Sequence, residues 1–379
     1  MGDPIASRCK DVNVLSDCSG SSKQVQGFYD SAAKNPINSS LDQRSRSRIY
    51  YLRNLNNWVK STVIADFLDK LHDKKTGQHI RVLDVCCGKG GDQLKWLKGR
   101  VDHVTFVDIS SASIDICKQR YTSLVNRNGH GQVFSAEFIV HDCTKTLQLK
   151  MKYDLVSCQF ALHYGFESIG QARIMLHNVS SALKEGGYFI VTLPNAYEIV
   201  SRLSRSKNKR SFGNSIYTIT FDEPFEPDQP MPLFGARYHF QLEGVVDCPE
   251  YLVYPPLLRA MAEEVGLHCV CGPLPFSTQM RRATRDTPHN VHLLRNMDAL
   301  ETWAERSESP HGNGRDRSRS PLGPRTSFSK PLMASSEAGS YAHVERKYGS
   351  LRLPVGTLSN QEWEAFCIYC IFVFRKKDI

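Results

Sequence analysis

The feature that most constrains the fold is a short apolar run that leads directly into a glycine turn. Residues 81–86 form an apolar segment typical of a buried strand, Gly88 to Gly91 form the turn, and helical sequence follows over 92–98. Glycines at such a turn let the backbone approach a bound ligand closely, with the N-terminus of a helix just beyond it. The order of these elements therefore predicts a ligand-binding turn at the end of a strand.

Strand and helix patterns alternate along the rest of the chain. The sequence predicts strands at 81–86, 103–108, 138–140, 153–160, 188–193 and 367–374, and helices at 44–71, 92–98, 113–124, 171–183 and 359–366. The pair Gly186-Gly187 is expected to close the helix over 171–183. Strands separated by helices in this way predict an α/β fold with βαβ units, a mostly parallel sheet and helices on both faces.

Changes in composition suggest how the chain is organised. We expect a flexible tail over 1–24, which lacks periodicity, followed by one domain over 25–379. Within that domain, 204–280 interrupts the alternation with basic, Pro-rich and acidic stretches and is expected to be an inserted subdomain. Residues 305–340 are rich in Arg, Ser and Pro with little apolar content, and we interpret them as a disordered, solvated loop.

Charge and apolar content limit the classes of partner. The chain carries 48 Lys and Arg against 39 Asp and Glu, a formal net charge of +9, which favours an anionic partner. No apolar run approaches the roughly 18 residues of a membrane-spanning helix, and the first 20 residues do not read as a secretion signal. These features predict a soluble intracellular protein that does not enter a membrane.

The cysteines indicate neither disulfides nor a metal site. The chain has 12 cysteines, and most lie within apolar segments, which is typical of reduced thiols used as small hydrophobic groups. The one Cys-x-x-Cys motif, Cys367 to Cys370, lies in a predicted strand and has no second ligand pair after it. A structural zinc site needs four ligands, so we expect no metal.

Two aspartates extend the ligand site predicted at the glycine turn. Asp108 ends the second strand, 20 positions after Gly88, and Asp142 follows the third strand. An acidic residue at that distance can accept hydrogen bonds from ribose hydroxyls, so the pattern predicts an adenosine site at the carboxyl edge of the sheet. The third glycine of the dinucleotide fingerprint is absent, which favours S-adenosylmethionine over NAD. An NAD oxidoreductase, or a plain turn with solvated aspartates, stays open as an alternative.

Several further motifs, in one order along the chain, resemble those of a single family. They are Ser45 to Lys60 (SRSRIYYLRNLNNWVK), Gly88 to Asp92 (GKGGD), Ser157 to Tyr164 (SCQFALHY), Phe234 to Asp247, Leu353 to Ser359 and Glu362 to Glu364. The chain resembles the eukaryotic mRNA cap guanine-N7 methyltransferases from about Gly27 to Phe374. The resemblance implies a class I S-adenosylmethionine-dependent methyltransferase fold, Rossmann-like, with an inserted subdomain. It also implies methyl transfer to N7 of the cap guanine.

The resemblance also implies the site residues. The cofactor S-adenosyl-L-methionine would be held by Lys60, the backbone at Cys86 and Gly88, Asp108, Asp142, Gln159 and Tyr164. The cap would be bound by Asn56, Asn57, Lys89, Lys95, Arg120, His163, Glu243 and Tyr369. Guanine N7 has a free lone pair and loses no proton, so no residue is expected to act as acid or base. Glu243, His163 and Tyr369 are instead expected to position the substrate.

One position departs from the family pattern, which usually has glycine where this chain has Cys86. If this backbone needs a positive φ, a cysteine there is strained and weakens cofactor binding. This departure leaves two alternatives: a non-catalytic RNA-binding module with a degraded cofactor pocket, or a class I methyltransferase with another substrate. By resemblance we further expect a nuclear protein acting on the capped 5′ end of mRNA. A small RNA-binding activating subunit and the transcription machinery are its expected partners.

Overall fold

The computed structural model describes residues 19–34, 47–74, 79–129, 131–303, 337–348 and 355–378. Residues 1–18 of the expected tail lie outside these ranges, and residues 19–24 begin the first described helix, α2 (Ser19–Lys34). Most of the expected Arg/Ser/Pro-rich loop, residues 305–336, also lies outside the described residues.

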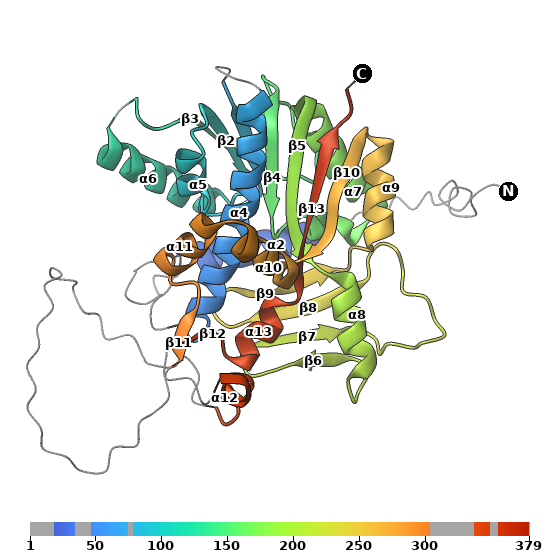
Figure 1. The fold of residues 1–379 in the computed structure, drawn as a ribbon. Helices are drawn as coiled ribbons and strands as arrows, with labels where there is room; N and C mark the ends of the chain where they lie inside the picture. Colours follow the sequence, from blue (N-terminus) through green and yellow to red (C-terminus); the bar gives the residue numbers. More distant parts are fainter. Residues whose placement is uncertain are drawn as a thin grey trace, which may run out of the picture.

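A seven-stranded sheet organises the fold, in the order β10-β13-β5-β4-β1-β2-β3 (Figure 1). Its strands are β1 (Arg81–Val85), β2 (His103–Asp108), β3 (Ser135–Val140), β4 (Tyr153–Gln159), β5 (Leu183–Pro194), β10 (Leu267–Pro275) and β13 (Tyr369–Lys376). Strands β1 to β5 pair in parallel, whereas β13 pairs antiparallel with both β5 and β10. The expected mostly parallel α/β sheet is confirmed.

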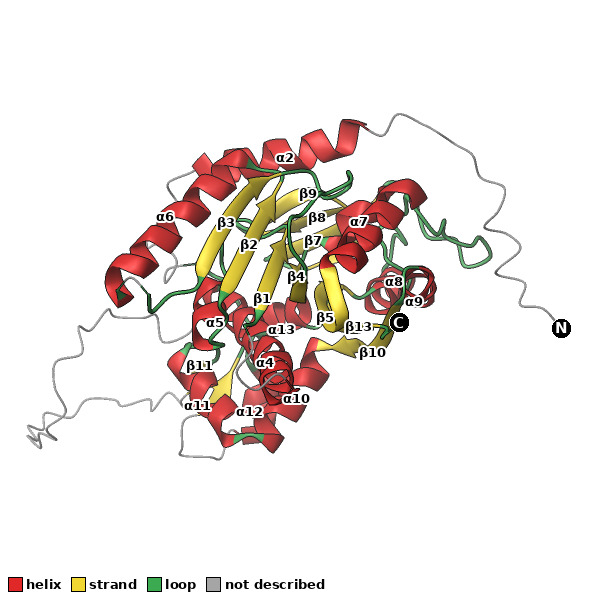
Figure 2. Cartoon of the chain, turned by 90° about the horizontal axis from the view of Figure 1, so that it is seen from above, coloured by secondary structure: helices red, strands yellow, loops and turns green. Residues whose placement is uncertain are grey.

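Helices lie on both sides of this sheet, as the view in Figure 2 shows. Besides α2, the described helices are α4 (Tyr50–Lys74), α5 (Gln93–Lys98), α6 (Ser111–Asn128), α7 (Ile169–Ala182), α8 (Ala196–Arg205), α9 (Pro255–Glu264), α10 (Phe276–Asp286), α11 (Pro288–Asn296), α12 (Ala342–Tyr348) and α13 (Asn360–Phe366), with a 3-10 helix at Leu162–Glu167. Within the described ranges, every helix is too short or too polar to cross a bilayer.

Each central strand is buried on both faces, which explains its nearly continuous apolar sequence. Along β1, Val82 packs into the core that contains α4, whereas its neighbours Leu83 and Val85 pack into the core that contains α7 and α9. Successive side chains of a strand point to opposite faces, so one strand contributes to both cores. The sheet is thereby packed between two helical layers, which makes its carboxyl edge a rigid support for the loops that follow the strands.

The end of α7 differs from the sequence-based expectation. The helix ends at Ala182 and β5 begins at Leu183, so Gly186 and Gly187 lie within the strand and do not cap the helix. Gly186 has a φ of +70°, and a Cβ on Gly187 would lie 2.9 Å from the carbonyl oxygen of Lys184. The pairing of β4 with β5 shifts register at this point. The two glycines therefore allow the backbone conformation that this irregularity in β5 requires.

A second sheet lies beneath the carboxyl edge of the first (Figure 1). It is antiparallel, with the order β6 (Ser211–Gly213), β7 (Tyr217–Phe221), β8 (Arg237–Leu242) and β9 (Val246–Tyr251). This sheet accounts for 211–251 of the segment 204–280, after which α9 follows and β10 pairs within the large sheet. A two-stranded sheet of β11 (Glu301–Trp303) and β12 (Val355–Thr357) completes the described strands.

A buried glutamate joins the C-terminal elements to the start of α4. Glu362 forms a capping box with Ser359 at the N-terminus of α13, and its Oε1 accepts a hydrogen bond of 3.0 Å from the Leu52 backbone N–H. Glu362 is fully buried, and burial, with a further contribution from Glu301, raises the pKa of its carboxyl group to about 7. A protonated carboxyl is therefore favoured in the folded chain up to neutral pH.

This raised pKa predicts a specific loss of stability with pH. The pKa of the Glu362 carboxyl group is higher in the folded chain than its unfolded value of about 4.3. The stabilisation that this group gives the fold is fully present below about pH 4.3 and disappears as the pH rises through about 7. Relative to Glu362→Gln, the wild-type chain should lose up to about 3 kcal/mol of unfolding free energy between pH 4.5 and pH 7.5. Urea unfolding of both proteins across this range measures the difference. Parallel pH profiles would contradict this role for Glu362.

Candidate active site

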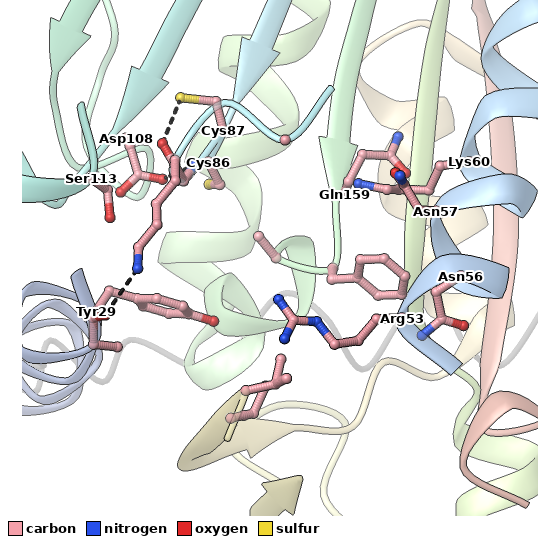
Figure 3. A pocket seen from close by; sticks show the side chains of 18 of the residues that line it. Tyr29, Arg53, Asn56, Asn57, Lys60, Cys86, Cys87, Asp108, Ser113 and Gln159 are labelled. Atoms are coloured by element: carbon pink, nitrogen blue, oxygen red, sulfur yellow. Dashed lines mark hydrogen bonds between the residues drawn. The ribbon is translucent and has the colours of Figure 1, made fainter. Parts of the chain in front are cut away.

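A large cavity lies between the carboxyl edge of the main sheet, the α4 helix and the β8–β9 pair (Figure 3). Its volume is about 960 Å³, near the upper end of the roughly 300–1,000 Å³ of ligand pockets. Helix α2 supplies one wall through Val25, Tyr29 and Ala32. The position agrees with the rule that ligands of open α/β sheets bind at the carboxyl ends of the strands.

The glycine turn and Asp108 form one end of the cavity. Gly88 and Gly90 have φ values of +52° and +68°, which glycine adopts without steric cost. The Gly88 N–H donates to Asp108 Oδ2 over 2.8 Å, and the Ser110 N–H donates to Asp108 Oδ1 over 2.9 Å. Burial raises the pKa of the Asp108 carboxyl group. Asp108 is thus fixed against the turn with acceptor oxygens at the cavity wall.

Cys86 occupies the position where the sequence raised a question. Its φ is +54°, in the left-handed region that costs a non-glycine residue about 1–2 kcal/mol. Phe160, at the end of the neighbouring strand β4, has a φ of +60° and also lines the cavity. Although the adjacent Cys143 acts in the opposite direction, the neighbouring Cys158 and burial raise the pKa of the Cys86 thiol. Backbone strain at two cavity-lining residues is typical of functional sites.

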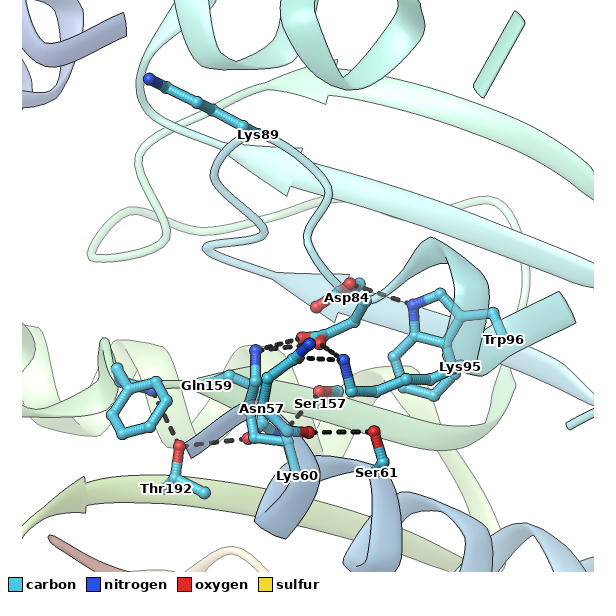
Figure 4. A network of polar contacts seen from close by, with 12 residues as sticks. Asn57, Lys60, Ser61, Asp84, Lys89, Lys95, Trp96, Ser157, Gln159 and Thr192 are labelled. Carbon is cyan, nitrogen blue, oxygen red and sulfur yellow. Dashed lines mark hydrogen bonds and ion pairs between the residues drawn. The ribbon is translucent and has the colours of Figure 1, made fainter. Parts of the chain in front are cut away.

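Two lysines share one buried carboxylate at the other end of the cavity (Figure 4). Asp92 Oδ1 lies 2.8 Å from Lys60 Nζ and 2.7 Å from Lys95 Nζ. Burial alone would raise the pKa of Asp92, but these two ammonium groups outweigh it and hold the pKa well below its usual range. Burial and the negative charge of Asp92 raise the pKa of the nearby Asp84 to about 8.

The charges in this cluster do not cancel. The two ammonium groups of Lys60 and Lys95 flank one ionised carboxylate, that of Asp92. Asp84 is favoured in its neutral form at neutral pH, and burial lowers the pKa of the Lys95 ammonium group. One positive charge therefore remains, and Lys60 is the lysine of the pair that lines the cavity. An uncompensated, nearly buried cation is expected to attract a carboxylate, such as that of an amino-acid ligand.

Lys95 lies outside the cavity, although the sequence placed it in the cap site. Its side chain is 8% exposed, is paired with Asp92, and donates a hydrogen bond to Asn57 Oδ1. Lys95 belongs to α5, which packs behind the glycine turn, so its ammonium group supports Asp92 and Asn57. Lys95 is therefore placed to support the residues of the cavity wall, and not to contact a ligand in the cavity directly.

Glu243 also lies outside the cavity. It stands in the turn between β8 and β9, its side chain is 43% exposed, and Oε2 lies 3.4 Å from Arg48 Nη1. The neighbouring Gly244 and Val245 line the cavity instead. The sequence motif thus lies in a segment that lines the cavity, but the side chain it selected is not among the cavity-lining residues.

The acidic residue of this segment that lines the cavity is Glu250, on β9. It is 3% exposed, and its Oε1 lies 3.3 Å from Nε2 of His163. Both ring nitrogens of His163 are buried and have no hydrogen-bond partner among the described residues. The sequence carries a signal for Glu250, because a glutamate directly before the apolar run 251–253 is buried only with a partner or a role.

The remaining expected site residues all line this cavity. They are Asn56, Asn57, Lys60, Cys86, Gly88, Lys89, Asp108, Arg120, Asp142, Gln159, His163, Tyr164 and Tyr369. Sequence reasoning missed Arg53, which is one helical turn from Asn57 and two turns from Lys60, and therefore shares their face of α4. Seven residues of helix span about 10 Å, so Arg53 faces a different part of the cavity from Lys60.

Helix α2 was also missed, because 19–24 read as part of a tail. The Tyr29 hydroxyl lies 2.9 Å from the Tyr164 hydroxyl, and Gln26 Nε2 donates to the Ile109 carbonyl over 3.3 Å. Lys89 Nζ donates to the carbonyl of Ala32 over 2.9 Å. Helix α2 thus contacts three segments that carry expected cofactor or cap residues. Over the described residues, no group of three or more His, Cys, Asp or Glu side chains is placed to hold a metal.

Comparison with known proteins places the chain beside one family. Residues 17–377 match the model of the mRNA (guanine-N(7))-methyltransferase domain. The mRNA cap guanine-N(7) methyltransferase of Drosophila melanogaster is 40% identical over 346 residues, covering 88% of this chain and 73% of that protein. The Caenorhabditis elegans protein of the same name is 36% identical over 364 residues, covering 94% and 87%. The Schizosaccharomyces pombe protein is 38% identical over 236 residues, covering 60% and 62%.

The buried position of Lys95 yields a prediction that separates its two possible roles. Lys95→Met removes the charge that offsets Asp92, so Asp92 then neutralises Lys60 and the cavity loses its attraction for a carboxylate. We expect the Kd for S-adenosylhomocysteine, measured by calorimetry, to rise about tenfold, with little change in KM for capped RNA. Lys98→Met removes the same charge from the exposed side of α5 and should leave both values unchanged. A raised KM for capped RNA with unaltered cofactor binding would support the direct cap contact instead.

Proposed function

The chain belongs to the mRNA (guanine-N(7))-methyltransferase family, and we propose that the large cavity lined by Lys60 and Glu250 binds the methyl donor and the cap guanine side by side. The protein transfers a methyl group from S-adenosylmethionine to N7 of the guanine cap at the 5′ end of mRNA. The main support for the proposed binding of both substrates in this cavity is the pair His163 and Glu250, buried side by side in the cavity wall.

The donor end of the cavity suits S-adenosylmethionine. Lys60, with the positive charge left uncompensated by Asp92, would bind the methionyl carboxylate. Asp108 would accept from the ribose hydroxyls, next to the close backbone approach allowed by Gly88. Asp142, Gln159, Tyr164 and the backbone at Cys86 complete this end. When bound, the cofactor supplies an electrophilic methyl group on a sulfonium.

The acceptor end suits the Watson–Crick edge of guanine. That edge presents two donors, N1–H and the 2-amino group, beside one acceptor, O6. Glu250 offers carboxylate oxygens to the two donors, and a protonated ring nitrogen of His163 offers a donor to O6. Tyr369 and Phe160, whose rings meet edge to face with centroids 4.8 Å apart, would pack against the base. This arrangement leaves N7 free.

Catalysis then needs orientation and charge compensation, and no proton transfer. Guanine N7 carries its lone pair in the ring plane, so no base is required before attack. Holding N7 in line with the bond to the leaving sulfur can supply roughly 7–11 kcal/mol of the barrier. Positive charge arrives on the guanine ring as the methyl group is transferred. The buried Glu250 carboxylate stabilises this charge, because a fixed anion acts strongly at a site that excludes water.

Three cationic residues face the space left for the triphosphate bridge. Lys89 lies in the glycine turn and Arg120 on α6, whose Nη1 donates to the Lys89 carbonyl over 2.8 Å. Arg53 faces the cavity from α4, on a different wall (Figure 3). The three phosphates of the cap carry one negative charge each, so these residues match the bridge in charge. Guanidinium and ammonium groups are the side chains that bind phosphate most strongly.

We also propose the cellular setting from the family alone. Family membership supports the capped 5′ end of mRNA as the substrate. The resemblance further implies that the protein acts on nascent transcripts. The expected location is therefore the nucleus, close to the transcription machinery. A small RNA-binding activating subunit is the expected further partner.

Two glutamates seven residues apart in the β8–β9 region, Glu243 and Glu250, give a decisive comparison. Glu250→Gln keeps the size and one acceptor oxygen of the side chain but removes its charge. We expect kcat/KM for GpppA-capped RNA to fall about 100-fold or more, with S-adenosylhomocysteine affinity within threefold of wild type. Glu243→Gln should retain nearly full activity, because that carboxylate lies outside the cavity. Neither protein should methylate uncapped pppA RNA.

The opposite result would return the guanine site to the turn between β8 and β9. Loss of activity in Glu243→Gln with a nearly normal Glu250→Gln would show that the exposed carboxylate reaches the substrate. Calorimetric titration with S-adenosylhomocysteine on each variant controls for loss of the cofactor site, and thermal unfolding controls for loss of the fold.

A further inference from the structure

We propose that Tyr238, which lies outside the cavity, is a positioning residue that sets the plane of the Glu250 carboxylate and thereby selects guanine through its 2-amino group. This inference rests on the proposed role of Glu250 as the guanine-binding residue. Tyr238 touches neither substrate nor cofactor in this account and acts only through Glu250.

The antiparallel pairing of β8 and β9 places the two residues directly opposite each other. Tyr238 and Glu250 are register partners, and their side chains lie on the same face of the second sheet. The Tyr238 hydroxyl donates a hydrogen bond of 2.9 Å to Glu250 Oε2. Tyr238 is fully buried, so this contact is sheltered from water. One of the two carboxylate oxygens is therefore held by the protein itself.

The second carboxylate oxygen faces the site. Glu250 Oε1 lies 3.3 Å from His163 Nε2, next to the ring nitrogens expected to meet guanine O6. A carboxylate can rotate about its last torsion with little preference, since that torsion has a broad, two-fold profile. Two guanine donors in one plane require both oxygens in that plane. A hydrogen bond to Oε2 removes this freedom before the substrate arrives, and Oε2 keeps a second lone pair for the base.

The position of the Tyr238 hydroxyl is itself rigid. Its ring packs against Phe221 on β7 with centroids 5.4 Å apart, and Tyr238 pairs with Phe221 across β7 and β8. Burial, with the adjacent Glu250 charge, raises the pKa of the Tyr238 phenol well above its usual value. The hydroxyl therefore remains a donor throughout the physiological pH range. The carboxylate is held by a group fixed in both place and protonation state.

This arrangement predicts a specific effect on base selection. Hypoxanthine, the base of inosine, differs from guanine only in lacking the 2-amino group. A site built to bind a donor discriminates against the analogue that lacks it, because its buried acceptor is left unpaired. The wild-type protein should therefore methylate GpppA with a higher kcat/KM than IpppA. Loss of the Tyr238 hydroxyl should reduce this preference for GpppA over IpppA while the protein stays folded.

The test compares the preference ratio, kcat/KM for GpppA over kcat/KM for IpppA, in four proteins. Tyr238→Phe should lower the ratio about fivefold or more, mainly through KM for GpppA, with the Kd of S-adenosylhomocysteine unchanged. Tyr217→Phe is the matched control. Tyr217 is a buried tyrosine of the same sheet, on β7, and its hydroxyl accepts a 2.8 Å hydrogen bond from Arg202 Nη1, outside the cavity. Its ratio should equal that of wild type.

The remaining two proteins separate this inference from the proposed function. Glu250→Gln should abolish most of the preference, and the double variant Tyr238→Phe/Glu250→Gln should match Glu250→Gln alone, because the tyrosine acts only through the glutamate. An unchanged ratio in Glu250→Gln overturns the proposed guanine site and the inference with it. A collapsed ratio in Glu250→Gln with a normal one in Tyr238→Phe overturns the inference alone. Equal losses in Tyr238→Phe and Tyr217→Phe also overturn it, since they indicate general damage to the sheet.

Discussion

The carboxylate of Asp92, shared between Lys60 and Lys95, is the interaction on which the geometry of the cavity depends. Lys60 belongs to α4, Asp92 follows the glycine turn and Lys95 belongs to α5. The cluster therefore joins the helix that forms one wall to the turn that forms another. A buried carboxylate with a single partner would be poorly compensated, whereas two ammonium groups hold it ionised and leave one charge for the methyl donor.

The acceptor half depends on a different part of the chain. The main sheet ends at the cavity with His163 and Tyr369, but the buried carboxylate comes from β9 of the second sheet. Donor and acceptor sites are thus built by separate sheets that meet at the carboxyl edge. The hydrogen bond from Tyr238 to Glu250, within the second sheet, fixes the acceptor site independently of the donor site. Orientation of the two substrates then follows from how the sheets pack.

The sequence predicted the parallel sheet and most of the cavity because both depend on local pattern. Apolar strands and a glycine turn specify where Gly88, Asp108 and Asp142 meet. The sequence selected Glu243, which does not line the cavity, and did not single out Glu250, which does. Which side chains of this segment face the cavity depends on the register of β8 with β9, which no local pattern gives. The sequence placed Lys95 in the cap site because its burial against Asp92 is a tertiary property that local pattern does not show. The positive φ of Cys86 likewise needed the structure.

The central claim is that one cavity seats guanine with its Watson–Crick edge on Glu250 and His163 and its N7 toward the methyl donor. A crystal structure of the protein with S-adenosylhomocysteine and GpppA measures this most directly. We predict that N1 and the 2-amino group lie within hydrogen-bonding distance of the Glu250 carboxylate, that O6 lies at His163, and that N7 faces the sulfur. A guanine whose edge lies on Glu243, or whose N7 points away from the sulfur, would contradict it.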